Sequence, residues 1–561
     1  MAARRFSLAL PVDLALVAAF VLVAVLAALA SSMLHPFDAP ELDPSPFLLP
    51  LYLFRSIARL LAAYTLAALL ALATGHLAAR SAFARRIILP TLDVLQSVPI
   101  LGFFPAAVAV FIGVFGHSAL GVEAAAIFLI FTSMFWNLAF GVYESLITIP
   151  EQLRMAADQF GLRGPLRWSR LLLPAAVPTF VYNSMLSWSN GWYFLIASEI
   201  IAVGKARYTL PGLGSYLGNA ITHGRTDQMV LALLSLLAVT IGTHLLVWSP
   251  LETWAQRFHI DESGARPRTP RIVRLLSHSR IARWILNKVI LPASQHTLAV
   301  TGRLMDMTAR LGTAAAIGSA LSLLVVLALV GYYLYELVTA SPLSAEARRI
   351  PFSLALSFLR VGIGVVLAVV VAVPLAYVTY RRPRVRAVTL SVLEILGSVP
   401  AVAFFPLIAV MMLRLRLPMD VGAILLVLTG TFFYVMFNVL SGATAIPKEM
   451  NEAASSLGLT GFHYLRRVFV PAILPSLVTG CVTAWGGGWN AIIFSEYVVA
   501  AGRTYSVRGI GATLDRATYV TGDLQVIALS LITMVGLVIL VNRVFWDPLY
   551  QHVATRYKLE T

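Results

Sequence analysis

The sequence has little charge and a single cysteine. Only 12% of its 561 residues are Asp, Glu, Lys or Arg, and 59% are hydrophobic, whereas a soluble domain averages roughly 25% charged residues. This composition excludes an ordinary soluble enzyme. The lone cysteine, Cys481, excludes an intramolecular disulfide and any site built from several thiolate ligands.

Lysine is also scarce, which bears on nucleotide binding. A phosphate-binding loop, G-x-x-x-x-G-K-[ST], needs a lysine between a glycine and a hydroxyl residue. Only Lys205 follows a glycine, and Ala206 stands where Ser or Thr is required. The histidines are scattered, without the spacing of a metal-binding motif. We therefore expect a chain that is not an enzyme, hydrolyses no ATP itself, and has no cofactor and no metal site.

Long apolar runs are abundant. Roughly six in each half reach the ~20 residues that an α-helix needs to cross ~30 Å of hydrocarbon, where each segment must satisfy its own backbone hydrogen bonds. We predict an all-α membrane protein with about twelve transmembrane helices. The first run follows Arg4 and Arg5 but is too long for a signal peptide, which predicts a retained helix. The runs lie at roughly 14–34, 52–78, 92–115, 121–143, 175–203, 228–250, 313–340, 353–380, 388–413, 421–442, 472–501 and 524–546.

The two halves repeat one pattern at a period of roughly 300 residues, which indicates an internal duplication. Because each half has an even number of helices, both copies enter the membrane in the same sense, as two parallel six-helix repeats. We predict a first half at 1–250 with its core at 52–250, a linker at 251–312, and a second half at 313–561 with its core at 353–546. The matching motifs are Ser97-Val98-Pro99 with Ser398-Val399-Pro400, Phe103-Phe104-Pro105 with Phe404-Phe405-Pro406, and Ser198-Glu199 with Ser495-Glu496.

The positive charge indicates the orientation in the membrane. The net charge is +16, and most lysines and arginines fall in loops on one side of the predicted helices. Cytoplasmic loops collect such residues, so we expect the N- and C-termini to be cytoplasmic. The basic linker suggests nucleic-acid binding, but a cytoplasmic linker beside anionic lipid headgroups is the simpler interpretation. We therefore expect the lipid bilayer, and no nucleic acid, as a partner.

A polar segment follows the fourth predicted helix of each half. In the second half it begins at Ile446-Pro447, contains Glu452, Ala453 and Ala454, and reaches Gly458. A proline near the start, helix formers and a glycine near the end predict one short helix and a turn. Small residues would let another surface approach closely. The first half has Met155, Ala156, Ala157 and Gly161 at the corresponding places, so Met155 replaces Glu452.

These residues resemble the coupling-helix motif of bacterial ABC-importer permeases. Over about 52–250 and 353–546, the chain looks most like the nitrate, sulfonate and taurine branch of that family. The resemblance implies a type I ABC-importer-like fold in the bacterial inner membrane, with two fused permease domains. It also implies two ATP-binding cassette subunits that dock on the coupling segments, an extracytoplasmic solute-binding protein, and a small polar solute, with an anion of the nitrate, sulfonate or taurine kind as a candidate.

Ionisable residues at membrane depth are costly and are candidates for function. On a helix, Trp188, Trp192 and Glu199 fall on one stripe, as do Trp485, Trp489 and Glu496. These stripes either line a translocation pathway or hold helices together through hydrogen-bonded carboxylates. Arg59 and Arg360 occupy equivalent places, where they either attract an anion or extend to lipid headgroups.

One difference between the halves lies within these stripes. Gly486-Gly487-Gly488 corresponds to Ser189-Asn190-Gly191. The glycines predict a loosened or broken helix, and we expect the difference to bear on the solute. The main alternative function is a twelve-helix secondary transporter of the major-facilitator type, driven by an ion gradient, which has no use for the short docking helices. An integral membrane enzyme is disfavoured because no further polar site recurs in the membrane.

Overall fold

The computed structural model describes residues 42–82, 119–162, 164–203, 206–258, 342–382, 405–500 and 503–556, with isolated residues or pairs between some of these segments. The predicted helix at 14–34, the linker from residue 259 onward and both Ser-Val-Pro motifs lie outside the described residues. Most of the predicted runs at 92–115 and 313–340, and the first part of that at 388–413, lie outside them too.

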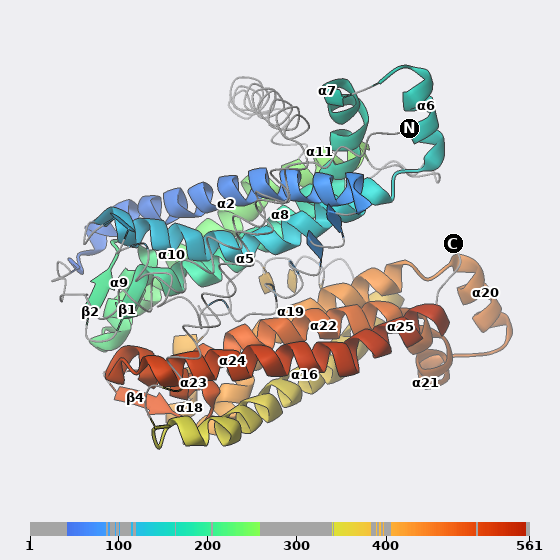
Figure 1. Cartoon of the computed structure of the whole chain (residues 1–561). Helices are drawn as coiled ribbons and strands as arrows, with labels where there is room; N and C mark the ends of the chain where they lie inside the picture. The colour runs from blue at the N-terminus through green and yellow to red at the C-terminus, as the bar shows by residue number, and fades with distance from the viewer. Residues whose placement is uncertain are drawn as a thin grey trace.

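Long helices form the frame of each half (Figure 1). In the first half, α5 packs between α2 and α8; in the second, α19 packs between α16 and α22. This recurring order follows the repeat in the sequence. The first-half helices are α2 (Leu49–Arg80), α5 (Ala119–Ile147), α8 (Leu173–Glu199), α10 (Thr226–Thr243) and α11 (Ser249–Ala255). The second-half helices are α16 (Ile350–Arg381), α18 (Phe405–Arg414), α19 (Met419–Thr444), α22 (Val470–Ser495), α24 (Leu524–Val541) and α25 (Asp547–Arg556).

Seven helical segments within the described residues are long and apolar enough to cross a membrane. They support the prediction of a helical membrane protein, while the full number of about twelve includes runs outside the described residues. The seven segments are Pro46–Arg80, Leu120–Ile147, Thr226–Phe258, Ala347–Arg381, Met419–Thr444, Gly461–Ser495 and Gln525–Arg556.

Shorter elements lie at the two ends of the helix bundle (Figure 1). One end carries α6 (Glu151–Gln159) and α7 (Gly164–Arg167), with α20 (Lys448–Ser456) and α21 (Gly461–Tyr464) as their second-half counterparts. The opposite end carries two β-hairpins, each followed by a short helix, α9 (Leu213–Thr222) or α23 (Ile510–Arg516).

The β-hairpins depart from the all-α prediction. Strand β1 (Ile200–Val203) pairs antiparallel with β2 (Ala206–Thr209), and β3 (Tyr497–Ala500) pairs with β4 (Arg503–Ser506). In each half the first strand directly follows a long helix. A four-residue apolar strand at the end of an apolar helix cannot be separated from that helix by periodicity alone, and this is why the sequence prediction extended the helices.

One of the hydrophobic clusters spans both halves, while a second large cluster belongs to the first half alone. Tyr193 and Phe194 of α8 belong to the same cluster of buried side chains as Trp489 and Ile492 of α22. Across the contact, the Tyr193 ring meets the Phe494 ring edge to face at 6.0 Å between centroids. The interior between α8 and α22 is therefore the place where a site common to both halves can form.

Candidate functional site

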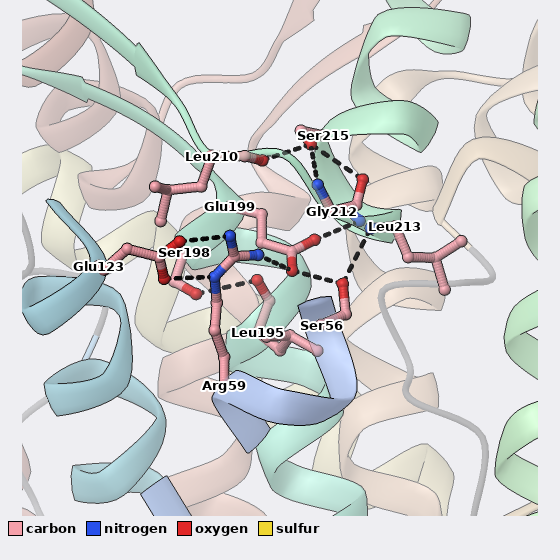
Figure 2. Close-up of polar contacts among 11 residues, drawn as sticks. Ser56, Arg59, Glu123, Leu195, Ser198, Glu199, Leu210, Gly212, Leu213 and Ser215 are labelled. Carbon is pink, nitrogen blue, oxygen red and sulfur yellow. Dashed lines mark hydrogen bonds and ion pairs between the residues drawn. The ribbon is translucent and has the colours of Figure 1, made fainter. Parts of the chain in front are cut away.

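A buried charge network joins four elements of the first half (Figure 2). Arg59 of α2 donates from Nη1 to Oε1 of Glu199 at 2.8 Å. Through Nε and Nη2 it also forms a two-pronged pair with Glu123 of α5, at 2.6 and 2.7 Å. Ser56 donates to the same Glu199 oxygen at 2.5 Å, and the Gly214 amide of α9 donates to Oε2 at 2.6 Å. The Glu199 side chain is fully buried.

The second half repeats this network. Arg360 donates to Glu496 at 2.5 Å, and its other nitrogen donates to Asp420 at 2.5 Å, where Asp420 takes the place of Glu123. Ser357 and the Gly511 amide donate to Glu496 at 2.7 and 2.8 Å. Sequence reasoning identified both arginines and both glutamates. It missed Glu123 and Asp420, although acids at equivalent repeat positions were a usable signal.

Glycine is required where the network meets α9 and α23. A Cβ atom on Gly212 would lie 2.2 Å from the Glu199 carboxyl group, and one on Gly509 would lie 2.1 Å from an oxygen of Glu496. The first amides of each short helix can therefore reach the carboxylate, as they reach anions at helix N-termini generally. The sequence left two roles open for Glu199 and Glu496, lining a pathway or holding helices together. The structure has the second arrangement, because each carboxylate is hydrogen-bonded to neighbouring helices.

The ring contacts of the predicted tryptophans Trp188 and Trp485 are with aromatic residues of their own halves. Trp188 contacts the rings of Tyr64 and Trp248 edge to face, and Trp192 is completely buried. Trp485 contacts Phe358 and Trp489 in the same manner. Such edge-to-face contacts are typical of a packed aromatic core.

A cavity of about 210 Å³ lies between the halves. It is walled mainly by α5 and α8 on one side and by α19 and α22 on the other. None of the predicted pathway residues Trp188, Trp192, Glu199, Trp485, Trp489, Glu496, Arg59 and Arg360 is among its described lining residues. The lining instead uses another face of the same helices, including Ser189, Asn190, Tyr193, Gly486, Gly487 and Asn490. Helical periodicity found the right helices, but it could not show which face meets the other half.

The glycine run does not break its helix. α22 is continuous through Gly486, Gly487 and Gly488, so the predicted break is wrong. Two of the three glycines serve close packing: a Cβ on Gly487 would lie 2.7 Å from the Tyr434 ring, and one on Gly488 would lie 2.9 Å from Val361, whereas one on Gly486 would meet no atom within 4 Å. Small residues commonly allow this approach between membrane helices.

The predicted docking segments form short helices, α6 and α20. Gly161 and Gly458, just beyond their ends, both have φ +67°, a left-handed conformation that favours glycine. Ala157 and Ala454 are buried against their own chain, so they do not present themselves to a partner as the sequence suggested. Glu452, Ala453 and Met155 are exposed, and Ala156 is half-buried.

Each of these helices presents an apolar residue at its C-terminal end. Phe160 is 82% exposed and Leu457, at the equivalent position, is 76% exposed. Contacts within the chain hold the segments in place: Arg154 donates to the Leu146 carbonyl at 2.8 Å, and Asn451, its counterpart, donates to the Tyr380 hydroxyl at 2.7 Å. A docking element requires a segment that is held in place by its own chain and exposes an apolar side chain, and both segments meet this requirement.

Comparison with known proteins decides the family. The family described as "Binding-protein-dependent transport system inner membrane component" matches residues 64–249 and 360–557, together more than half of the chain. The chain belongs to this family. It matches once in each half, which confirms the resemblance to ABC permeases and the presence of two fused permease domains. The protein is thus a multi-pass inner-membrane transport component and not an enzyme.

Individual relatives match about one third of the chain. The taurine transport system permease protein TauC of Escherichia coli (strain K12) is 26% identical over 185 residues, covering 33% of this chain and 66% of the relative. The nitrate import permease protein NrtB of Synechocystis is 24% identical over 186 residues, covering 33% and 62%. These matches span less than two thirds of the relatives' own length.

Proposed function

We propose that the chain supplies two permease domains to the membrane-spanning unit of an ATP-driven importer, with the cavity between its halves as part of the translocation pathway. The observation that carries the proposal is the pair of equivalent helices α6 and α20, each with an exposed apolar tip at the same end of the bundle. Two ATP-binding cassette subunits would dock there. Their closure on ATP would move the halves and alternate access to the cavity.

The basic loops support the orientation. Arg167 and Arg170 follow α6 in the chain, and Arg167 pairs with Asp158 of α6 at 2.7 Å; Arg466 and Arg467 follow α20. By the positive-inside rule this end faces the cytoplasm of a bacterial cell, with both termini on the same side. The hairpin end then faces outward, where an extracytoplasmic binding protein would deliver the solute.

A small polar solute fits the cavity. Its volume of about 210 Å³ is below the roughly 300–1,000 Å³ of pockets for drug-sized ligands. Relatives named for taurine and nitrate transport support a small anion or zwitterion. Family membership and the duplicated α6 and α20 helices favour this function over the major-facilitator alternative, which needs no docking helices.

The first experiment is purification from the native host in mild detergent, with subunit counting by mass spectrometry. We expect two ATP-binding subunits per chain. They should be lost from a variant that carries Phe160→Glu and Leu457→Glu, because both side chains are exposed and charge would oppose an apolar contact. Phe47→Glu is the matched control, because Phe47 is at least as exposed but lies directly before α2 and not on α6 or α20. A chain that purifies alone and moves solute without ATP would overturn the proposal.

A further inference from the structure

We propose that the cavity binds the anionic group of its solute through neutral N–H donors that come from the first half alone. The donors are the side-chain amides of Gln96, Asn137 and Asn190. This inference rests on the proposed function and deepens it, because it names the solute class and the wall of the pathway that recognises it.

The described lining residues of the cavity include no charged side chain. Recognition there must use neutral hydrogen bonds, which are stronger in a low-dielectric interior than in water. Neutral donors also suit a transport pathway, because a solute must enter favourably and still leave. An arginine or lysine would hold an anion more tightly than release allows.

Most polar groups around the cavity already have partners. The Ser133 and Thr429 hydroxyls donate to backbone carbonyls of their own helices at 2.6 and 2.7 Å. Thr483 does so at 3.0 Å. Asn490 is occupied at both ends, since its oxygen accepts from the Ile100 amide at 2.9 Å and its nitrogen donates to the Gly486 carbonyl at 3.2 Å. These hydroxyls are left with acceptor lone pairs, not with free donors.

Three side-chain amides of the first half remain among the described lining residues. Asn190 accepts from the Tyr434 hydroxyl at 2.8 Å through its oxygen, and its amide nitrogen has no partner among the residues that the structure describes. The Gln96 and Asn137 amides have none there either. A ligand atom that accepts hydrogen bonds would satisfy these N–H donors. The Trp136 indole nitrogen also lacks a partner, but it is buried out of reach of the cavity.

The repeat shows that this donor set is one-sided. Gln96, Asn137 and Asn190 correspond to Gly397, Tyr434 and Gly487 in the second half. Gly397 and Gly487 have no side chain. The space left at Gly487 is taken by the Tyr434 ring, whose hydroxyl fixes Asn190. The second half therefore orients a donor of the first half and contributes none of its own from these positions.

A set of N–H donors facing a small volume selects an oxyanion. A sulfonate or nitrate group offers several acceptor oxygens and carries the charge that makes each hydrogen bond stronger than a neutral one. An ammonium group finds no anionic partner among the described lining residues. The inferred solute is thus a small oxyanion, or a zwitterion whose oxyanion end lies against α5 and α8.

The test uses the assembled transporter in proteoliposomes, with isotope-labelled taurine and nitrate as probes. Asn190→Asp and Asn137→Asp keep the size of the side chain but replace the N–H donors by a carboxylate. We expect each to lower ATP-driven uptake by about ten- to a hundredfold, as loss of a hydrogen bond to a charged group implies. Subunit composition should be unchanged. Thr479→Val, on α22 but outside the described lining, removes a hydroxyl that donates to the Pro475 carbonyl of its own helix at 3.0 Å, and it is expected to change uptake less than about twofold.

The outcomes separate this inference from the function on which it rests. If the intact complex lacks ATPase subunits or ATP-driven uptake, the proposed function fails and the inference fails with it. If the complex transports either probe and both aspartate variants keep normal uptake, the inference alone is overturned. Faster uptake of a cationic solute by Asn190→Asp, or ATP-driven uptake of a neutral or cationic solute only, would overturn it as well.

Discussion

At the scale of single residues, the two arginine–glutamate pairs stand out because their side chains are at most 7% exposed. A buried ion pair is weak evidence of net stabilisation, but removing one partner leaves a charge without compensation and costs about 3–5 kcal/mol. We therefore expect Arg59→Ala to lower the thermal stability of the purified protein strongly, and Glu199→Gln, which keeps two hydrogen-bonding atoms, to lower it less.

Heating followed by size-exclusion chromatography in detergent measures this effect. Arg516→Ala is the control, since Arg516 forms only an exposed pair with Glu346 at 3.7 Å and exposed pairs contribute about 0–1 kcal/mol. Equal melting temperatures for Arg59→Ala and Arg516→Ala would show that the network does not stabilise the first half.

The glycines beside the carboxylates give a second prediction at this scale. Gly509→Ala would place a methyl group within 2.1 Å of a Glu496 oxygen, so α23 must move away from the carboxylate. We expect a lower melting temperature and reduced expression of folded protein. Gly536→Ala, where no atom lies within 4 Å, is the matched control and should be neutral or slightly stabilising. The same result for both variants would refute the close-contact argument.

Sequence alone identified the costly charges but not their partners. Arg360 and Glu496 attract notice because ionisable groups at membrane depth are rare. Whether they line a pathway or bridge helices depends on what packs opposite, and a one-dimensional pattern does not contain that information. The hydrogen bond from the Gly511 amide to Glu496 joins residues on either side of a hairpin that the sequence did not predict.

At the scale of elements, α6 and α20 were predicted closely because proline, helix formers and glycine punctuate them. They differ at several exposed positions, and Met155 against Glu452 is the one beside the shared Ala-Ala pair. If both helices dock on ATPase subunits, exchanging these residues tests their equivalence without disturbing the fold. We expect Glu452→Met to weaken retention of ATPase subunits and to lower ATP-driven uptake several-fold. Met155→Glu should leave both unchanged or raise them.

Subunit counting by mass spectrometry and uptake assays on the same preparations check this prediction. The Glu452→Met and Met155→Glu double variant controls for total charge. Unaltered retention and uptake in Glu452→Met would show that the carboxylate plays no part in docking, whatever the helix itself does.

At the scale of the whole molecule, the duplication predicts two similar halves but not how they meet. The repeated motifs set the order of helices in each half. The contact between α8 and α22, and with it the cavity, depends on side chains such as Tyr193 and Phe494 that differ from their repeat counterparts. The departures from the repeat, and not the repeat itself, thus mark the shared site.

Alternating access requires the halves to move against each other at this contact. Joining them there should stop transport. In a Cys481→Ala background, which removes the only native thiol, we would introduce Tyr193→Cys and Phe494→Cys and treat the complex with a short bifunctional thiol reagent. We expect loss of ATP-driven uptake while the ATPase subunits still copurify, because the coupling helices lie at the far end of the bundle. The same double variant before treatment is the control, and the loss is measured against its own uptake. Full uptake after complete cross-linking would mean that the solute passes without relative movement of α8 and α22, and the cavity would then have to open through other helices.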